Sequence, residues 1–193
     1  MTEENFSPQE SLRLIQSMIK KTKQDISESS IHFLVWGWIT FIACTSQFVL
    51  KNIFNYEKHY LVWSLTIVGI IFSNWYSFKK GKTRKVKTYI GDSINHLWIG
   101  MAIAYFVLSM MLTVIGWNRP VFPFFILLYG LGAFISGSII QFRPLVIGGI
   151  IAFILAIASV FAGYDYQMLF GAGAILASYI IPAYILRSRK LSA

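Results

Sequence analysis

The sequence predicts an all-α integral membrane protein with six transmembrane helices and both termini in the cytoplasm, preceded by a cytosolic amphipathic helix. Its 193 residues are 56% hydrophobic and only 13% charged, whereas soluble domains contain about 25% charged residues. Six apolar stretches are each close to the ~20 residues that cross ~30 Å of hydrocarbon. They cover residues 31–50, 60–78, 97–117, 121–140, 145–163 and 168–186.

The positive charges predict how these stretches are oriented. When the chain is threaded alternately across a bilayer, all but three of its 17 Lys and Arg residues fall on one side. The exceptions are Lys51, Lys58 and Arg119. Because short cytoplasmic loops are enriched in Lys and Arg, the larger set marks the cytoplasm. We therefore expect a multi-pass protein of the bacterial inner (cytoplasmic) membrane, divided into residues 1–30 and a bundle over residues 31–193.

The net charge of +9 does not indicate a nucleic-acid partner, because the basic residues lie in short segments next to the spans, where membrane topology already requires them. The expected partner is the lipid bilayer itself, and the oligomeric state stays open. A single cysteine, Cys44, rules out an intramolecular disulfide.

A helix is expected to begin near residue 7, because Ser7, Pro8 and Glu10 form the pattern of a capping box with proline at the first helical position. Apolar residues then recur at helical spacing, and Leu12, Ile15 and Ile19 form the predicted docking face. Such a helix either lies on the membrane surface or packs on protein, within the bundle or on a partner. No cleavable signal peptide is expected in the first 30 residues.

The loop after the second span is strongly basic. Its predicted contact residues for anionic lipid headgroups or a partner are Lys79, Lys80, Lys82, Arg84, Lys85 and Lys87. The same charges are also explained as a topogenic cytoplasmic loop. The loop lacks the glycine spacing of a phosphate-binding loop, so it does not predict nucleotide binding.

The last three spans are rich in small residues at intervals of four, as in Gly148, Ala152 and Ala156. Such spacing lets helix backbones approach closely in lipid, so we expect spans four to six to be the most tightly packed part, with these faces meeting within the chain. Pro182 lies inside the sixth span and predicts a bend there.

The centres of the spans contain no Asp, Glu, Lys or Arg, which argues against a proton or sodium pump with a carboxylate relay. The one candidate cluster lies at the mouths of spans one and three. It comprises Glu28 with His32 and Asp92 with His96, each pair four residues apart on one helix face. If the mouths adjoin, these groups form a metal site or an acid–base pair; the favoured expectation is that they do not converge and that Asp92 caps span three. His59 lies on the opposite side and cannot join them. No catalytic residue, metal or cofactor is assigned.

Three segments resemble a family of uncharacterised six-span bacterial inner-membrane proteins. They are Ser11–Ile15, Phe33–Trp38 and Phe142–Gly149. The resemblance implies a bacterial membrane protein and no particular activity. The expected function is therefore a non-enzymatic membrane sensor, regulatory partner or assembly factor that uses the N-terminal helix and the basic loop. The alternatives are a small transporter or channel for a neutral or apolar solute and, third, a lipid-acting membrane enzyme.

Overall fold

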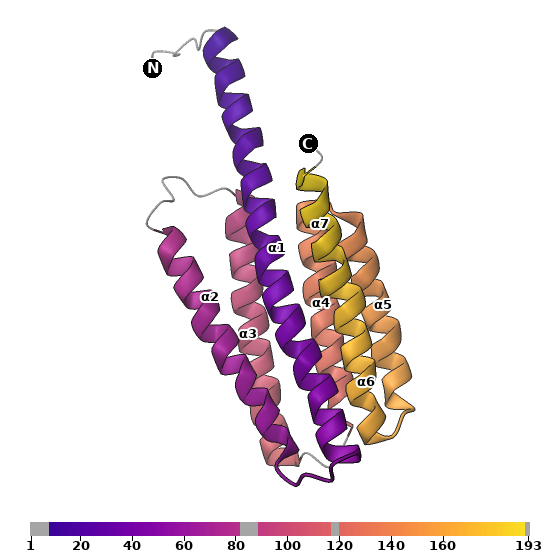
Figure 1. The fold of residues 1–193 in the computed structure, drawn as a ribbon. Coiled ribbons are helices and arrows are strands. Elements are labelled where there is room, and N and C mark those ends of the chain that lie inside the picture. The colour runs from indigo at the N-terminus through magenta and orange to yellow at the C-terminus, as the bar shows by residue number, and fades with distance from the viewer. Residues whose placement is uncertain (1–7, 82–88, 117–119, 192–193) are drawn as a thin grey trace.

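The computed structural model describes residues 8–81, 89–116 and 120–191, and the side chains within 30–76, 78–79, 91–116 and 120–188. The described chain is helical, in agreement with the predicted fold class (Figure 1). Its elements are α1 (Pro8–Asn52), η1 (His59–Ser64), α2 (Leu65–Gly81), α3 (Tyr89–Ile115), α4 (Phe122–Ile140), α5 (Arg143–Val160), α6 (Tyr164–Ile175), η2 (Leu176–Ile180) and α7 (Ile181–Leu191).

Five helical segments are long and apolar enough to cross a membrane. They are Ser30–Asn52, Gly91–Ile115, Phe122–Ile140, Arg143–Val160 and Tyr164–Ser188. The last combines α6, η2 and α7 into one rod. These segments bring the chain into contact with a lipid bilayer, and the N- and C-terminal ends lie at the same end of the bundle (Figure 1).

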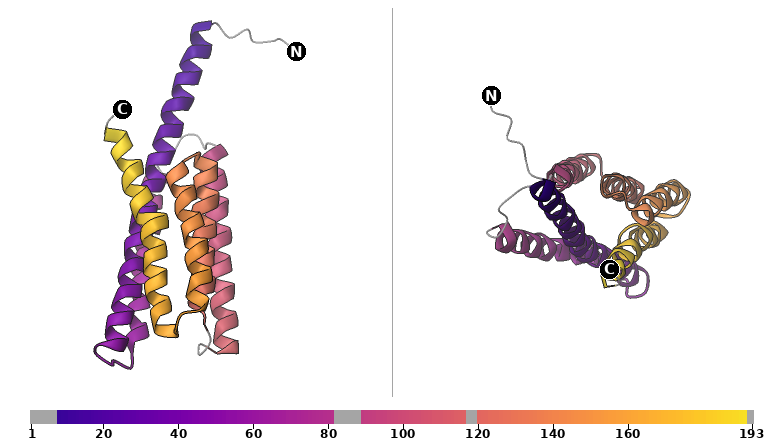
Figure 2. Two further views of the ribbon diagram at one scale, coloured as in Figure 1. Left: turned by 90° about the vertical axis from the view of Figure 1, so that its right-hand side faces the viewer. Right: turned by 90° about the horizontal axis from the view of Figure 1, so that it is seen from above.

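Helix α1 differs from the sequence prediction in one respect. Residues 8–30 and the first span were expected as two elements, but they form one unbroken helix of 45 residues that begins at Pro8, close to the expected start. The reason is that no glycine or proline occurs between Pro8 and Gly37 to interrupt the helix. The N-terminal part of α1 extends well beyond the other helices (Figure 2).

The second predicted span is also corrected. Its first turn is the 3₁₀ helix η1, and α2 itself has 17 residues, which gives a length of about 25 Å, less than the ~30 Å hydrocarbon layer. Helix α2 rests on α1, where Gly69 faces the side chains of Ile39 and Trp36. The Trp36 indole Nε1 donates a hydrogen bond to Ser73 Oγ at 3.1 Å. Apart from this contact with α1, most apolar side chains of α2 are exposed and suited to lipid.

Helices α4, α5 and α6 form the most tightly packed part of the bundle, as the small residues predicted. Ala133 in α4, Ala152 in α5 and Ala174 in α6 are fully buried. A Cβ atom added to Gly149 would lie 2.8 Å from the backbone nitrogen of Phe134, so glycine is what allows the backbones of α4 and α5 to approach. The small-residue faces therefore meet within one chain.

The bend expected at Pro182 takes the form of a π turn, η2, which ends two residues before the proline. There the Ile181 N–H bonds to the Leu176 carbonyl, five residues earlier. A proline ring clashes with the carbonyl four residues before it, and the wider π turn relieves this crowding. The rod of α6 and α7 changes direction at this level (Figure 2).

Candidate functional site

The predicted acid–His cluster does not form a metal site from its described members. Among the residues whose side chains the structure describes, no group of three or more His, Cys, Asp or Glu could hold a metal ion. His96 Nδ1 lies 2.8 Å from the backbone carbonyl of Asp92, and the His32 ring packs edge-on against Tyr76 at 5.6 Å between centroids. The side chain of Glu28 lies outside the described set.

Asp92 does not occupy the N-cap position of span three. Helix α3 begins at Tyr89, so Asp92 lies in its first turn. A negative charge there still interacts favourably with the helix dipole. The expectation of a cap at Asp92 was wrong because the polar residues before the apolar run continue the helix instead of starting it.

Most of the predicted contact surface lies outside the described side chains. This applies to Leu12, Ile15 and Ile19, for which only the helical backbone is described, and to Lys80, Lys82, Arg84, Lys85 and Lys87. Lys79 is described, and its Nζ lies 5.2 Å from the ring centroid of Trp75. The docking face and the basic loop therefore stay predictions.

A different polar cluster lies at the opposite end of the bundle, where α1 ends and η1 begins. Gln47 in α1 is only 4% exposed. Its Oε1 accepts a hydrogen bond from Trp63 Nε1 at 2.6 Å, and its Nε2 lies 3.2 Å from His59 Nδ1. The buried amide thus joins two side chains of η1 to α1. We call these three residues the Gln47 cluster.

An ion pair lies beside the Gln47 cluster. Lys51 in the last turn of α1 pairs with Asp165 in the first turn of α6, an arrangement in which each charge also complements the dipole of its own helix. Lys51 Nζ also lies 4.5 Å from the ring centroid of Tyr164. Both charged side chains are about one third exposed, so the pair fixes geometry more than it adds stability.

The electrostatic surroundings favour the neutral form of His59. Partial burial and the Lys51 charge lower the pKa of His59 below its usual 6.5, and the Asp165 carboxylate opposes part of this effect. A neutral imidazole is what an acceptor role at Nδ1 requires.

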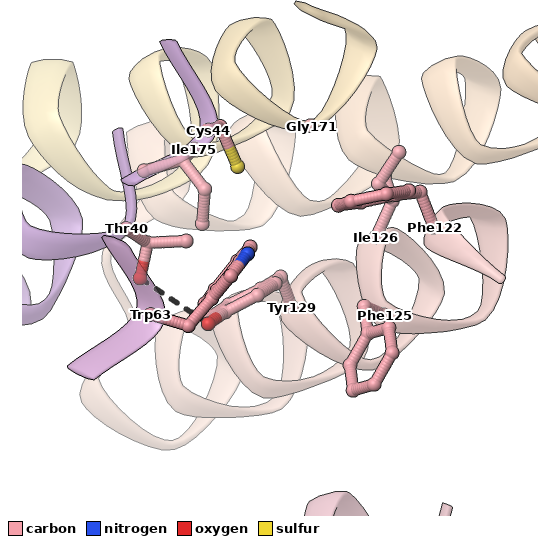
Figure 3. A pocket seen from close by; sticks show the side chains of 9 residues that line it. All are labelled: Thr40, Cys44, Trp63, Phe122, Phe125, Ile126, Tyr129, Gly171 and Ile175. Atoms are coloured by element: carbon pink, nitrogen blue, oxygen red, sulfur yellow. Dashed lines mark hydrogen bonds between the residues drawn. The ribbon is translucent and has the colours of Figure 1, made fainter. Parts of the chain in front are cut away.

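Trp63 extends from the Gln47 cluster to an internal pocket (Figure 3). The pocket is lined by Thr40, Cys44, Trp63, Phe122, Phe125, Ile126, Tyr129, Gly171 and Ile175. Its walls are mostly apolar and it has room for roughly one water molecule. Thr40 Oγ1 and Tyr129 Oη form a hydrogen bond of 3.2 Å at its edge. The indole ring of Trp63 therefore links the Gln47 cluster at the end of the bundle to the pocket in the interior of the bundle.

Sequence reasoning missed this cluster. The sequence pattern predicts no site that contains Gln47, and it places His59 only on the side opposite the acid–His residues. The available signal was that Gln47 and Lys51 lie in the last turns of one apolar stretch while His59 and Trp63 open the next, so a short connection brings them to the same end.

The helices and their apolar surfaces define a multi-pass helical membrane protein. Comparisons with protein-family models, with curated proteins and with solved structures give no match for this chain.

Proposed function

We propose that the chain is a non-enzymatic sensor or regulatory protein of the bacterial inner membrane, in which α1 links the Gln47 cluster at one end of the bundle to a contact surface at the other. An assembly factor is included in this proposal, because such a protein would use the same contact surface. The proposed partner is a protein or an anionic lipid surface bound by the N-terminal part of α1 and the basic loop.

The continuity of α1 is the observation that carries this proposal. A helix of 45 residues is about 68 Å long, more than twice the ~30 Å hydrocarbon layer. Its span segment packs on α2, α3, α6 and α7, and its last turns hold Gln47 and Lys51. Since a helix transmits rotation and tilt along its axis, a change at the Gln47 cluster displaces the protruding N-terminal part.

The proposed orientation places the N- and C-terminal ends in the cytoplasm. The start of α5, the end of α7 and the end of α2 lie at the same end of the bundle as the start of α1 (Figure 1). These segments contain the exposed residues Arg143, Arg187 and Lys79. The positive-inside rule assigns that end to the cytoplasm. The Gln47 cluster then faces the periplasmic side. In this arrangement residues 60–64 and α2 together complete the sixth crossing, and His59 lies outside it at the periplasmic end.

The alternative of a transporter or channel for a neutral or apolar solute requires a polar or solute-sized path. The pocket beside Thr40 and Tyr129 is mainly apolar and holds roughly one water molecule, so this pocket is not itself such a path. A lipid-acting enzyme would need Glu28, His32, Asp92 and His96 to act together, and His96 Nδ1 faces the backbone carbonyl of Asp92 instead of a side chain of this set.

Hydrogen exchange of residues 9–24 tests the contact surface. In native membranes these amides should exchange at least tenfold more slowly than in nanodiscs of neutral lipid, because a bound partner or anionic lipid covers them. Nanodiscs containing anionic lipid distinguish protection by lipid from protection by a protein partner. Replacement of Leu12, Ile15 and Ile19 by Ser should remove the added protection. Equal exchange in native membranes and neutral nanodiscs would show that this segment is not a contact surface.

A helix-breaking variant tests the link along α1. Ser27→Pro interrupts the helix between the protruding part and the span, whereas Ser27→Ala keeps it continuous. We expect the proline variant to insert normally and to lose the protection of residues 9–24, and the alanine variant to keep it. Full protection in an inserted proline variant would contradict a role for helix continuity.

A further inference from the structure

The hydrogen bonds of the Gln47 cluster have a fixed direction. An indole N–H can only donate, so the oxygen of the Gln47 amide must face Trp63, at 2.6 Å. The amide nitrogen consequently faces His59 Nδ1, at 3.2 Å. This nitrogen has only N–H groups to offer, and therefore Nδ1 must accept. His59 is held as the neutral tautomer with its proton on Nε2.

Protonation of His59 is incompatible with this arrangement. A protonated imidazole carries hydrogens on both ring nitrogens, so two donors would face each other between Gln47 and His59. Rotation of the Gln47 amide by a half turn would satisfy His59 but would oppose the amide N–H groups to the indole N–H of Trp63. No orientation of the buried amide satisfies both neighbours.

The charges around His59 do not remove this conflict. Lys51 on α1 is positive and Asp165 on α6 is negative, and the two are paired with each other. Glu57, Lys58 and Tyr60 are its neighbours in the chain, and Tyr60 contacts the His59 ring edge-on at 6.1 Å. Arg119 lies outside the residues that the structure describes. Asp165 is engaged by Lys51, and the described contacts give His59 no carboxylate of its own.

We propose that the Gln47 cluster is a proton-operated switch in which protonation of His59 releases η1 from α1. Release frees the end of α1, withdraws Trp63 from the internal pocket and exposes the buried amide of Gln47 to water. The switch rests on the proposed sensor function and names its stimulus. That stimulus is acidification on the side of the membrane that the Gln47 cluster faces.

The pH window follows from the direction of the His59 pKa. Burial and Lys51 lower the pKa of His59 in the folded protein relative to 6.5, so the unfolded or released chain binds more protons just below pH 6.5. Attachment of η1 therefore strengthens as pH rises through this window. Its contribution is complete above pH 6.5 and is lost as pH falls through the folded-state pKa.

The switch can be observed at Trp63. Full-length protein labelled with 5-fluorotryptophan in nanodiscs gives a ¹⁹F resonance for this residue, assigned by its loss in Trp63→Phe. We expect this resonance to move between pH 8 and 4.5 with a single midpoint below 6.5. A resonance that does not respond to pH would overturn the proposal.

Two variants of the cluster remove the donor conflict in different ways. His59→Asn places a non-titrating acceptor near the position of Nδ1, so the Trp63 resonance should stay in its high-pH position. Gln47→Glu supplies a carboxylate that accepts from Trp63 and from protonated His59, so protonation no longer sets two donors against each other and the release of η1 at low pH should be lost. Release of η1 at low pH as in the wild type, in either variant, would contradict the assignment.

A second measurement does not depend on any variant. The ¹⁵N shifts of His59 at pH 8 should show Nδ1 unprotonated and Nε2 protonated. The opposite tautomer would overturn the hydrogen-bond argument directly.

Failure of the switch and failure of the sensor function are distinguishable. Spin labels at residues 16 and 188, in a Cys44→Ala background, report the distance between the protruding part of α1 and α7. A pH-dependent distance that His59→Asn abolishes supports both proposals. A response of Trp63 with an unchanged distance supports the switch and removes its link to the sensor function.

Discussion

Gly148 lies where α5 approaches the π turn, and its replacement by alanine should be the most damaging such change among the glycines whose surroundings the structure describes. A Cβ atom at this position would lie 2.5 Å from the Ala177 carbonyl oxygen and 2.7 Å from Ser178 Cα. Both contacts are with backbone, so no side-chain rotation relieves them. Either α5 or η2 must move.

The magnitude can be worked out by comparison with Gly100 in α3, which has no atom within 4 Å of an added Cβ. Gly→Ala in a helix favours folding by about 0.5–1 kcal/mol at either site. Overpacking costs about 1–3 kcal/mol at Gly148 only. The propensity gain cancels in the comparison, so Gly148→Ala should be about 1–3 kcal/mol less stable than Gly100→Ala.

Reversible unfolding by denaturing detergent in mixed micelles measures both variants against the wild type. Gly100→Ala should be at least as stable as the wild type, because its new methyl group meets no atom of the chain. If Gly148→Ala were as stable as Gly100→Ala, the close backbone approach between α5 and the π turn would be refuted.

Three further predictions concern the cluster, the pocket and the topology. Gln47→Leu should lower the free energy of unfolding by about 1–3 kcal/mol, because it leaves Trp63 Nε1 without its acceptor. The control is Thr45→Val, which should change the free energy of unfolding by less than about 0.5 kcal/mol, because the Thr45 hydroxyl bonds to carbonyls of its own helix. Equal effects of the two substitutions would contradict the role of Gln47. A double-mutant cycle of Thr40→Val and Tyr129→Phe in the same unfolding assay should give a coupling of about 0.6 kcal/mol, and additive effects would count against their hydrogen bond. Single cysteines in a Cys44→Ala background should be labelled from the cytoplasm at residues 5 and 83 and from outside at 55 and 165; labelling of 55 and 83 from one side would refute the six-span topology.

The sequence by itself determined the helical membrane fold and many of the helix boundaries. Long apolar runs cannot satisfy their backbone groups in lipid except as helices, and prolines at the starts of α1, α4 and α5 mark where these helices begin. Small residues at intervals of four also located the tightest packing. The continuity of α1 could also be predicted from the sequence, because a change from polar to apolar side chains does not end a helix that contains no glycine or proline at that point.

The start of the second span required tertiary structure. Apolar content alone extends that span to Tyr60, yet residues 59–64 form a 3₁₀ helix. The side chains of His59 and Trp63 are drawn to Gln47 across the connection, and this long-range contact outweighs local helix propensity.

The candidate site could be found only in the folded bundle. Lys51 and Asp165 are far apart in the sequence, and they meet because α6 packs beside α1. Apolar runs set how many helices form and how long they are, but they do not set the order of helices around a bundle, because a lipid-facing and a protein-facing apolar side chain look alike in sequence. The order is decided by close backbone approaches such as Gly148 against η2 and by directed hydrogen bonds such as those of Gln47, which exist only once the helices have packed.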